Sequence, residues 1–123
     1  MEGDKKILVV DDDEMILKIT DLFLHKAGYE ILKVESGPEC LEFLKHNKVD
    51  LILMDVEMPG LNGFETIQEI RKNHLADDTP AYFLSGSKEA EVRTELGLTP
   101  ADGFIRKPFM PVELLEAVCK ASS

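Results

Sequence analysis

Five short apolar runs alternate with longer amphipathic stretches along the chain, and this alternation limits the possible folds more than any other feature. Short apolar runs are typical of buried strands, and apolar residues spaced three or four apart are typical of helices. The pattern predicts strands at about residues 7–10, 30–34, 50–54, 81–84 and 104–106. It predicts helices at about residues 14–27, 37–46, 63–73, 87–96 and 111–121. Strands and helices in strict alternation form a parallel sheet with helices on both faces.

The composition of each strand predicts its place in that sheet. Residues 7–10 and 51–54 are uninterrupted apolar runs, as expected of central strands, and residues 81–84 are nearly as apolar. The second strand contains Lys33 and the fifth contains Arg106, and charged residues are typical of exposed edges. We therefore predict an α/β fold, a doubly wound, flavodoxin-like parallel sheet of five strands in the order 2-1-3-4-5 with five helices.

Several residues mark the ends and faces of the predicted helices. Ser36 and Glu39 are interpreted as a capping box, and Asn62 with Glu65 as a weaker one. The histidines fall near helix ends and are interpreted as terminal residues rather than ligands: His25, His46 and His74. The first helix is expected to present one apolar face, with Lys26 turned outward: Met15/Ile16, Ile19 and Leu22/Phe23.

Length and charge exclude several classes of protein. With 123 residues there is room for one hydrophobic core, so we expect one domain over residues 1–123. No apolar run approaches a membrane span and the N-terminus lacks a secretory signal, so we expect a cytoplasmic protein with no membrane contact. The net charge of −10 argues against direct nucleic-acid binding. Cys40 and Cys119 lie in helical apolar patterns and are expected to be buried free thiols in a reducing compartment.

Acidic and polar residues follow the strands at the edge where a ligand would bind. Asp11 and Asp12 follow the first strand, Asp55 the third, Ser85 the fourth and Lys107 the fifth. In open parallel sheets the ligand site lies beyond the C-terminal ends of the strands, where the strand order reverses. We therefore expect the three carboxylates to converge, with the serine and the lysine beside them.

Three carboxylates in one pocket repel one another unless a cation lies between them. Mg²⁺ suits such a set, because it prefers oxygen ligands and binds through one or two carboxylates together with water. We expect Asp12 and Asp55 to be direct ligands and Asp11 to act through water. The backbone carbonyl of Glu57 is expected to complete the set.

With a cation bound, Asp55 is expected to be a nucleophile toward phosphorus, because carboxylates can form aspartyl phosphates. Lys107 and the hydroxyl of Ser85 would hold the other phosphoryl oxygens. Each residue also has an ordinary interpretation: Asp13 and Ser85 as cap or turn residues, and Lys107 as a solvated edge lysine. Their joint occurrence at matching strand ends favours the phosphoryl site.

Four segments resemble the receiver domain of two-component response regulators, in particular its stand-alone chemotaxis members: ILVVDDDE (7–14), LILMDVEMPGLNGFE (51–65), AYFLSGS (81–87) and ADGFIRKPF (101–109). The resemblance extends from about Lys5 to Lys120. It implies that Asp55 is the phosphoryl acceptor, that Asp11 and Asp12 are the acidic metal pair, and that Ser85 is the switch hydroxyl. It also implies that Lys107 holds the phosphoryl group and precedes a cis peptide to Pro108.

The resemblance further implies a phosphohistidine donor, on a sensor histidine kinase or a histidine phosphotransfer protein, and a downstream target protein. Such a receiver catalyses only its own phosphorylation and dephosphorylation and is not an enzyme in the turnover sense. No output domain follows Lys120, so we expect output through protein contact, with a phosphorylation-linked homodimer as one form of it. Helix 4, strand 5 and helix 5 would form the switching surface. The kinase, the target, the lifetime of the phosphoryl group and the extent of the native chain are not encoded in recognisable form.

Some positions depart from the usual receiver pattern. Phe104 occupies the place of an aromatic switch residue that is often Tyr, and it lacks the hydroxyl. Ser85 replaces the commoner Thr and Gly86 the commoner Ala. Glu57 adds a carboxylate near the acceptor, and we hypothesise that it alters the lifetime of the phosphoryl group on Asp55.

Other functions fit the sequence less well. A haloacid-dehalogenase-like phosphatase would use Asp11 and Asp13, but its later acidic pair is absent after Lys107, where only Glu113 and Glu116 occur. A flavin binder would need a loop rich in Ser, Thr and Gly after the first strand, whereas this loop is acidic. A receiver relic that acts only as a protein-interaction module remains the third alternative.

Overall fold

The computed structural model describes residues 5–122, and residues 1–4 and 123 of the expected domain lie outside this part. The strands are β1 (Lys6–Val10), β2 (Glu30–Val34), β3 (Leu51–Asp55), β4 (Ala81–Ser85) and β5 (Gly103–Arg106). The helices are α1 (Glu14–Lys26), α2 (Gly37–His46), α3 (Gly63–Lys72), α4 (Lys88–Glu95) and α5 (Pro111–Ser122). Each predicted strand and helix is confirmed to within one or two residues.

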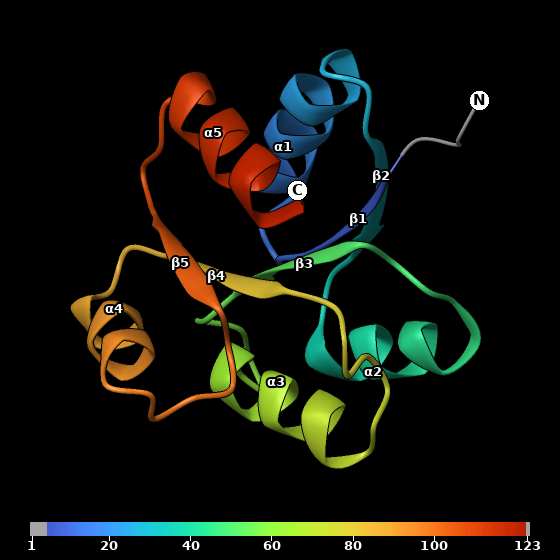
Figure 1. The fold of residues 1–123 in the computed structure, drawn as a ribbon, viewed down its shortest axis with the longest axis vertical. Helices are drawn as coiled ribbons and strands as arrows, with labels where there is room; N and C mark the ends of the chain where they lie inside the picture. Colours follow the sequence, from blue (N-terminus) through green and yellow to red (C-terminus); the bar gives the residue numbers. More distant parts are fainter. Residues whose placement is uncertain (1–4, 123) are drawn as a thin grey trace.

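The strands form one parallel sheet in the order β2-β1-β3-β4-β5, as predicted. Helices α1 and α5 cover one face, and α2, α3 and α4 cover the other (Figure 1). The central strand β1 shows why both faces must be covered. Ile7 and Val9 belong to the core under α1 and α5, whereas Leu8 and Val10 belong to the core on the opposite side, and all four are fully buried. No helix within residues 5–122 is long and apolar enough to cross a membrane.

The edges of the sheet are also as predicted. Lys33 of β2 and Arg106 of β5 are exposed, whereas every residue of β3 is buried. Strand β3 lies in the middle of the sheet, so its last residue, Asp55, ends between β1 and β4. This position fixes where the chemistry of the protein can take place.

The predicted face of α1 is only partly right, because Ile16 and Phe23 pack against the core but do not form its centre. The helix buries Leu17, Thr20 and Leu24, whereas Met15 is 60% exposed and Leu22 is 53% exposed. Because α1 has apolar residues around most of its circumference, its sequence period does not decide which side meets the sheet. Packing against the sheet selects the Leu17–Leu24 side, since both leucines join the core that α1 shares with α5.

Two further expectations about burial need correction. Cys40 is buried, but Cys119 is exposed on α5, so only one of the two free thiols lies in the core. The sequence of the fourth predicted helix, 87–96, contains only three residues suited to burial: Ala90, Val92 and Leu96. Of these only Ala90 is buried, while Val92 and the C-cap Leu96 are 40% and 66% exposed. Helix α4 is therefore attached through even fewer core contacts than the sequence indicates.

The order of strength of the two capping boxes is the reverse of the prediction. At α3 the Asn62 side chain accepts from the Glu65 backbone N–H, and the Glu65 carboxylate accepts from the Asn62 backbone N–H. At α2 Ser36 accepts from the Glu39 backbone N–H, but the Glu39 carboxylate accepts from the residue before the cap. The box at α3 is reciprocal, and the one at α2 is not.

The histidines are helix-terminal residues, as predicted. His25 and His46 lie in the last turns of α1 and α2. His74 follows the end of α3 and has a left-handed backbone, with φ of 54°. Neither His46 nor His74 contacts the carboxylate edge of the sheet; each ring instead pairs with a nearby carboxylate on the surface, Glu42 and Asp77 respectively.

Candidate functional site

The three carboxylates predicted to converge do so. Asp11 directly follows β1 and Asp55 is the last residue of β3, and these strands pair in parallel with Val10 beside Met54. Carboxylate oxygens of Asp11, Asp12 and Asp55 lie within 4.8 Å of one another. Asp11 is fully buried and Asp55 is 6% exposed, whereas Asp12 faces solvent. The cluster thus has two buried carboxylates and one that faces solvent.

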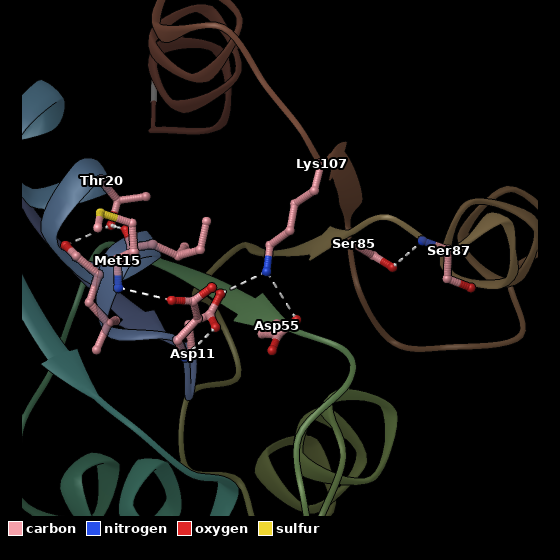
Figure 2. Close-up of polar contacts among 10 residues, drawn as sticks. Asp11, Met15, Thr20, Asp55, Ser85, Ser87 and Lys107 are labelled. Atoms are coloured by element: carbon pink, nitrogen blue, oxygen red, sulfur yellow. Dashed lines mark hydrogen bonds and ion pairs between the residues drawn. The ribbon is translucent and has the colours of Figure 1, made fainter.

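Lys107 brings a positive charge to the same site. It follows β5, and its Nζ donates to Asp11 at 2.9 Å and to Asp55 at 3.3 Å (Figure 2). The lysine is thus beside the carboxylates, as predicted, and its shorter contact is with Asp11. The peptide between Lys107 and Pro108 is cis, as the family resemblance implies. The lysine therefore bridges the carboxylates of two central strands.

The charges of the site perturb one another. Burial raises the pKa of Asp55 to about 6, with a smaller contribution from the Asp11 carboxylate, and the Lys107 ammonium only partly opposes this increase. Burial acts to lower the pKa of Lys107, but the two carboxylates that it contacts outweigh this effect, so its pKa is raised overall. The single ammonium group of Lys107 thus does not offset the cost of burying the charged Asp55 carboxylate.

Ser85 is buried and is the last residue of β4, where the sequence pattern placed it directly after the strand. Its hydroxyl oxygen accepts a hydrogen bond of 2.9 Å from the backbone N–H of Ser87, the N-cap of α4, so it is turned toward that helix (Figure 2). The interpretation of Ser85 as a turn residue thus describes its present contact. Phe104 of β5 lies beside Phe83 of β4 and is half-buried against the core under α2, α3 and α4.

The remaining candidates take simpler positions. Asp13 is the N-cap of α1 and accepts from the Met15 backbone N–H at 2.9 Å. Its backbone N–H in turn donates to the Asp11 carboxylate at 2.9 Å, which holds that side chain in place. Glu57, two residues after Asp55, is exposed. The part of its backbone carbonyl in metal binding stays a prediction.

Sequence reasoning did not single out Gly63 as part of the site. A Cβ atom at this position would lie 2.4 Å from the backbone oxygen of Asp55 and 2.7 Å from the Cα of Val56. The backbone N–H of Gly63 also donates to the Val56 carbonyl at 2.8 Å. Glycine is needed here because the start of α3 packs directly on the backbone of Asp55. The signal was the glycine that closes the segment MPGLNG.

The donor set fits a hard divalent cation. All three side chains offer carboxylate oxygens, two of them are buried, and Lys107 neutralises only part of their charge. Mg²⁺ prefers this type of ligand and accepts water at its remaining positions. Solvent can reach the cluster from the side of the exposed Asp12.

Comparisons with known proteins show the family of the chain. The family model described as the response regulator receiver domain matches residues 7–119. The chain belongs to this family. Receiver domains are the phosphoryl-accepting modules of two-component signal transduction, and this chain is one of them.

Among curated relatives, this receiver is 38% identical to the regulatory protein VanR of Enterococcus faecium, over 92% of the chain and 48% of VanR. It is also 38% identical to the alkaline phosphatase synthesis transcriptional regulatory protein PhoP of Bacillus subtilis, over 89% of the chain and 45% of PhoP. The chain thus spans about half the length of the curated relatives that it matches.

Two solved structures illustrate the likeness of the receiver fold. The chemotaxis response regulator CheY4 of Vibrio cholerae has a TM-score of 0.88 and 31% identity, covering 97% of this chain and 99% of CheY4. The response regulator TrrA of Thermotoga maritima, solved in complex with Mg²⁺ and BeF, has a TM-score of 0.83 and 37% identity, covering 95% of this chain and 98% of TrrA. The phosphatase and flavin-binding alternatives are therefore not supported.

Proposed function

We propose that Asp55 of this receiver accepts a phosphoryl group from a phosphohistidine of a sensor histidine kinase or a histidine phosphotransfer protein. The observation that carries the proposal is the buried Asp55 carboxylate at the end of β3, with Asp11 and Asp12 within 4.8 Å and the Lys107 ammonium at 3.3 Å. Few structural roles would keep so many charges together at one edge of a sheet, because their mutual repulsion costs stability.

We infer that Mg²⁺ is the cofactor of this reaction. Asp12 and Asp55 would be direct ligands, Asp11 would act through water, and the Glu57 backbone carbonyl would complete the set. Bound there, the cation would neutralise the carboxylates and the charge of the incoming phosphoryl group. The complex of TrrA with Mg²⁺ and BeF supports this choice of ion.

The residues of the chain would then act as follows. An oxygen of the Asp55 carboxylate forms a bond to phosphorus while the bond from phosphorus to the histidine nitrogen breaks, and the released imidazole takes a proton from solvent. Lys107, already between Asp11 and Asp55, holds a phosphoryl oxygen by charge. The Ser85 hydroxyl leaves the Ser87 N–H and donates to another phosphoryl oxygen. Water later hydrolyses the acyl phosphate, so the chain acts only on itself and is not a turnover enzyme.

The same steps suggest how the signal leaves the site. Movement of Ser85 toward the phosphoryl group would free space behind β4, and Phe104, half-buried beside Phe83, can fill it. The surface of α4, β5 and α5 would then change shape and bind a downstream protein or a second copy of the chain. The net charge of −10 disfavours direct contact of this surface with nucleic acid. The free thiols of Cys40 and Cys119 suit the reducing cytoplasm.

The test is intact-mass measurement after incubation with the phosphodonor acetyl phosphate, with and without Mg²⁺, for wild type and Asp55→Asn. We expect a gain of one phosphoryl group that requires Mg²⁺ and is absent from the Asn variant. Mg²⁺ binding without a mass gain would limit the donor to a specific kinase, and addition of phosphorylated histidine phosphotransfer protein would then give the mass gain. A chain that neither binds Mg²⁺ nor gains mass with either donor would be a relic that acts only as an interaction module.

A further inference from the structure

A second concave site lies beside the carboxylate cluster. It is a groove of about 730 Å³ between α3, α4 and the loop that follows β3. The buried ring of Phe64 and the exposed side chain of Leu98 are among its apolar lining. The volume is within the range of pockets that bind ligands in proteins, about 300–1,000 Å³. None of the contacts proposed for the phosphoryl group uses the side chains of this groove.

The charge of the groove is unbalanced. Its lining contains three carboxylates, Glu57, Glu65 and Glu89, and one guanidinium, Arg93. Arg93 is already engaged, because its Nη2 lies 2.6 Å from Glu89 and its guanidinium lies 4.2 Å above the Phe64 ring. The groove therefore offers an apolar surface next to two carboxylates that no cation in its lining neutralises, which suits a positively charged occupant.

Thr99 provides an independent indication of an occupant. This residue lines the groove and is 8% exposed, and within residues 5–122 its hydroxyl oxygen is buried without a hydrogen-bond partner. The other buried threonines behave differently, because the hydroxyls of Thr20 and Thr66 each donate to the backbone carbonyl four residues earlier. A buried hydroxyl without a partner is costly, so a group that reaches this oxygen through a small shift of the groove wall would be favoured.

We propose that this groove docks a short segment of another protein that carries a Lys or Arg next to an apolar side chain. The apolar side chain packs on Phe64 and Leu98, and the cation faces Glu57 and Glu65. A backbone group of the segment supplies the hydrogen bond that Thr99 lacks. The site is separate from the surface formed by α4, β5 and α5, because it lies on the α3 side of α4.

The test is a titration of the ¹⁵N-labelled chain with the tripeptide amide acetyl-Leu-Arg-Leu, followed by NMR without Mg²⁺ or phosphodonor. The result then does not depend on phosphorylation of Asp55. We expect saturable shifts of the backbone amides of Phe64, Gln68 and Thr99, with a Kd on the order of 1 mM for so small a probe. Acetyl-Leu-Glu-Leu amide should leave these amides unshifted. Unsaturable shifts, or shifts confined to Asp11, Asp12 and Asp55, would overturn the proposal.

Two variants separate docking from general charge and from stability. Glu57→Gln should weaken binding of the arginine peptide at least threefold, whereas Glu116→Gln, which removes the same charge from exposed α5, should not. Thr99→Val should raise the denaturation midpoint, because it removes the unpaired hydroxyl. The same variant should bind the arginine peptide more weakly. Equal losses in Glu57→Gln and Glu116→Gln, or full binding by Thr99→Val, would contradict docking in this groove.

Discussion

At the scale of single residues, Gly63 sets how closely α3 approaches the end of β3. Its backbone angle is not in the left-handed region, so the need for glycine is steric rather than conformational. The atoms that an added Cβ would meet belong to the backbone of Asp55 and Val56, which cannot turn aside as a side chain can. Any larger residue must therefore push α3 away from the site.

We predict that Gly63→Ala lowers the free energy of unfolding by about 1–3 kcal/mol or more, as overpacking of a close contact does. Gly86→Ala is the matched control, because a Cβ there would meet only the Lys107 carbonyl, at 3.7 Å. Urea denaturation of the two variants beside wild type measures the difference. Equal midpoints for the two alanine variants would show that α3 relaxes freely.

The residues of the site were predictable to different degrees. Asp11, Asp12 and Asp55 lie at the ends of two buried strands and Lys107 follows the edge strand β5. Because parallel strands end at one edge of the sheet, sequence alone brings these charges together. The hydrogen bond of Ser85 to Ser87 was not predictable, because it depends on a rotamer that the start of α4 selects. The same holds for the preference of Lys107 for Asp11, which follows from side-chain reach.

At the scale of elements, strands were easier to predict than the faces of helices. Central strands such as β3 are apolar up to their last residue and are buried on both faces, so their prediction does not depend on which side meets the core. Helix α1 is apolar on more than one side, and only the tertiary contacts of Leu17 and Leu24 decide which side is buried. Helix α4 shows the opposite problem: it has too few apolar residues for their spacing to indicate a buried face, and only Ala90 is buried.

Helix α4 should therefore be the least protected helix. We predict that its backbone amides exchange with deuterium faster than those of α3, which buries five residues against one in α4. Native-state hydrogen exchange measured by NMR tests this, with α3 as the internal reference because it neighbours α4 around the groove. Protection of α4 equal to that of α3 would contradict the assignment of α4 as a switching element.

The two capping arrangements lead to a second prediction for elements. Asn62→Ala removes the 2.9 Å bond that the Asn62 side chain accepts from the Glu65 backbone N–H, and so leaves only the backbone half of the reciprocal box at α3. Ser36→Ala removes a longer bond, of 3.2 Å, at α2. We expect Asn62→Ala to cost about 1–2 kcal/mol of unfolding free energy and Ser36→Ala to cost about 0.5–1 kcal/mol. Thermal denaturation of both variants at one pH compares them. A larger loss for Ser36→Ala would favour the order that the sequence alone predicts.

At the scale of the whole molecule, the charged site connects the ends of β1, β3 and β5, and burial of its charges lowers the stability of the folded chain. In the unfolded chain an Asp ionises near pH 4, whereas burial raises the pKa of Asp55 in the fold to about 6. Between these values the folded chain binds more protons than the unfolded chain. The contribution of Asp55 to stability therefore falls as the pH rises from about 4 to about 6, and it stays low above that range.

Removal of this charge should stabilise the protein. We predict that Asp55→Asn has a free energy of unfolding higher than wild type by about 1–3 kcal/mol at pH 7.5 without divalent cations, and that the difference vanishes near pH 4. Mg²⁺ should reduce the difference at pH 7.5, because a ligand that binds only the folded wild type stabilises it. Asp78→Asn, which removes an exposed carboxylate from the loop before β4, should show neither effect. Guanidinium denaturation of the three chains at both pH values, with and without Mg²⁺, measures these changes. An Asn variant less stable than wild type at pH 7.5 would mean that the contact with Lys107 outweighs the burial of the Asp55 charge.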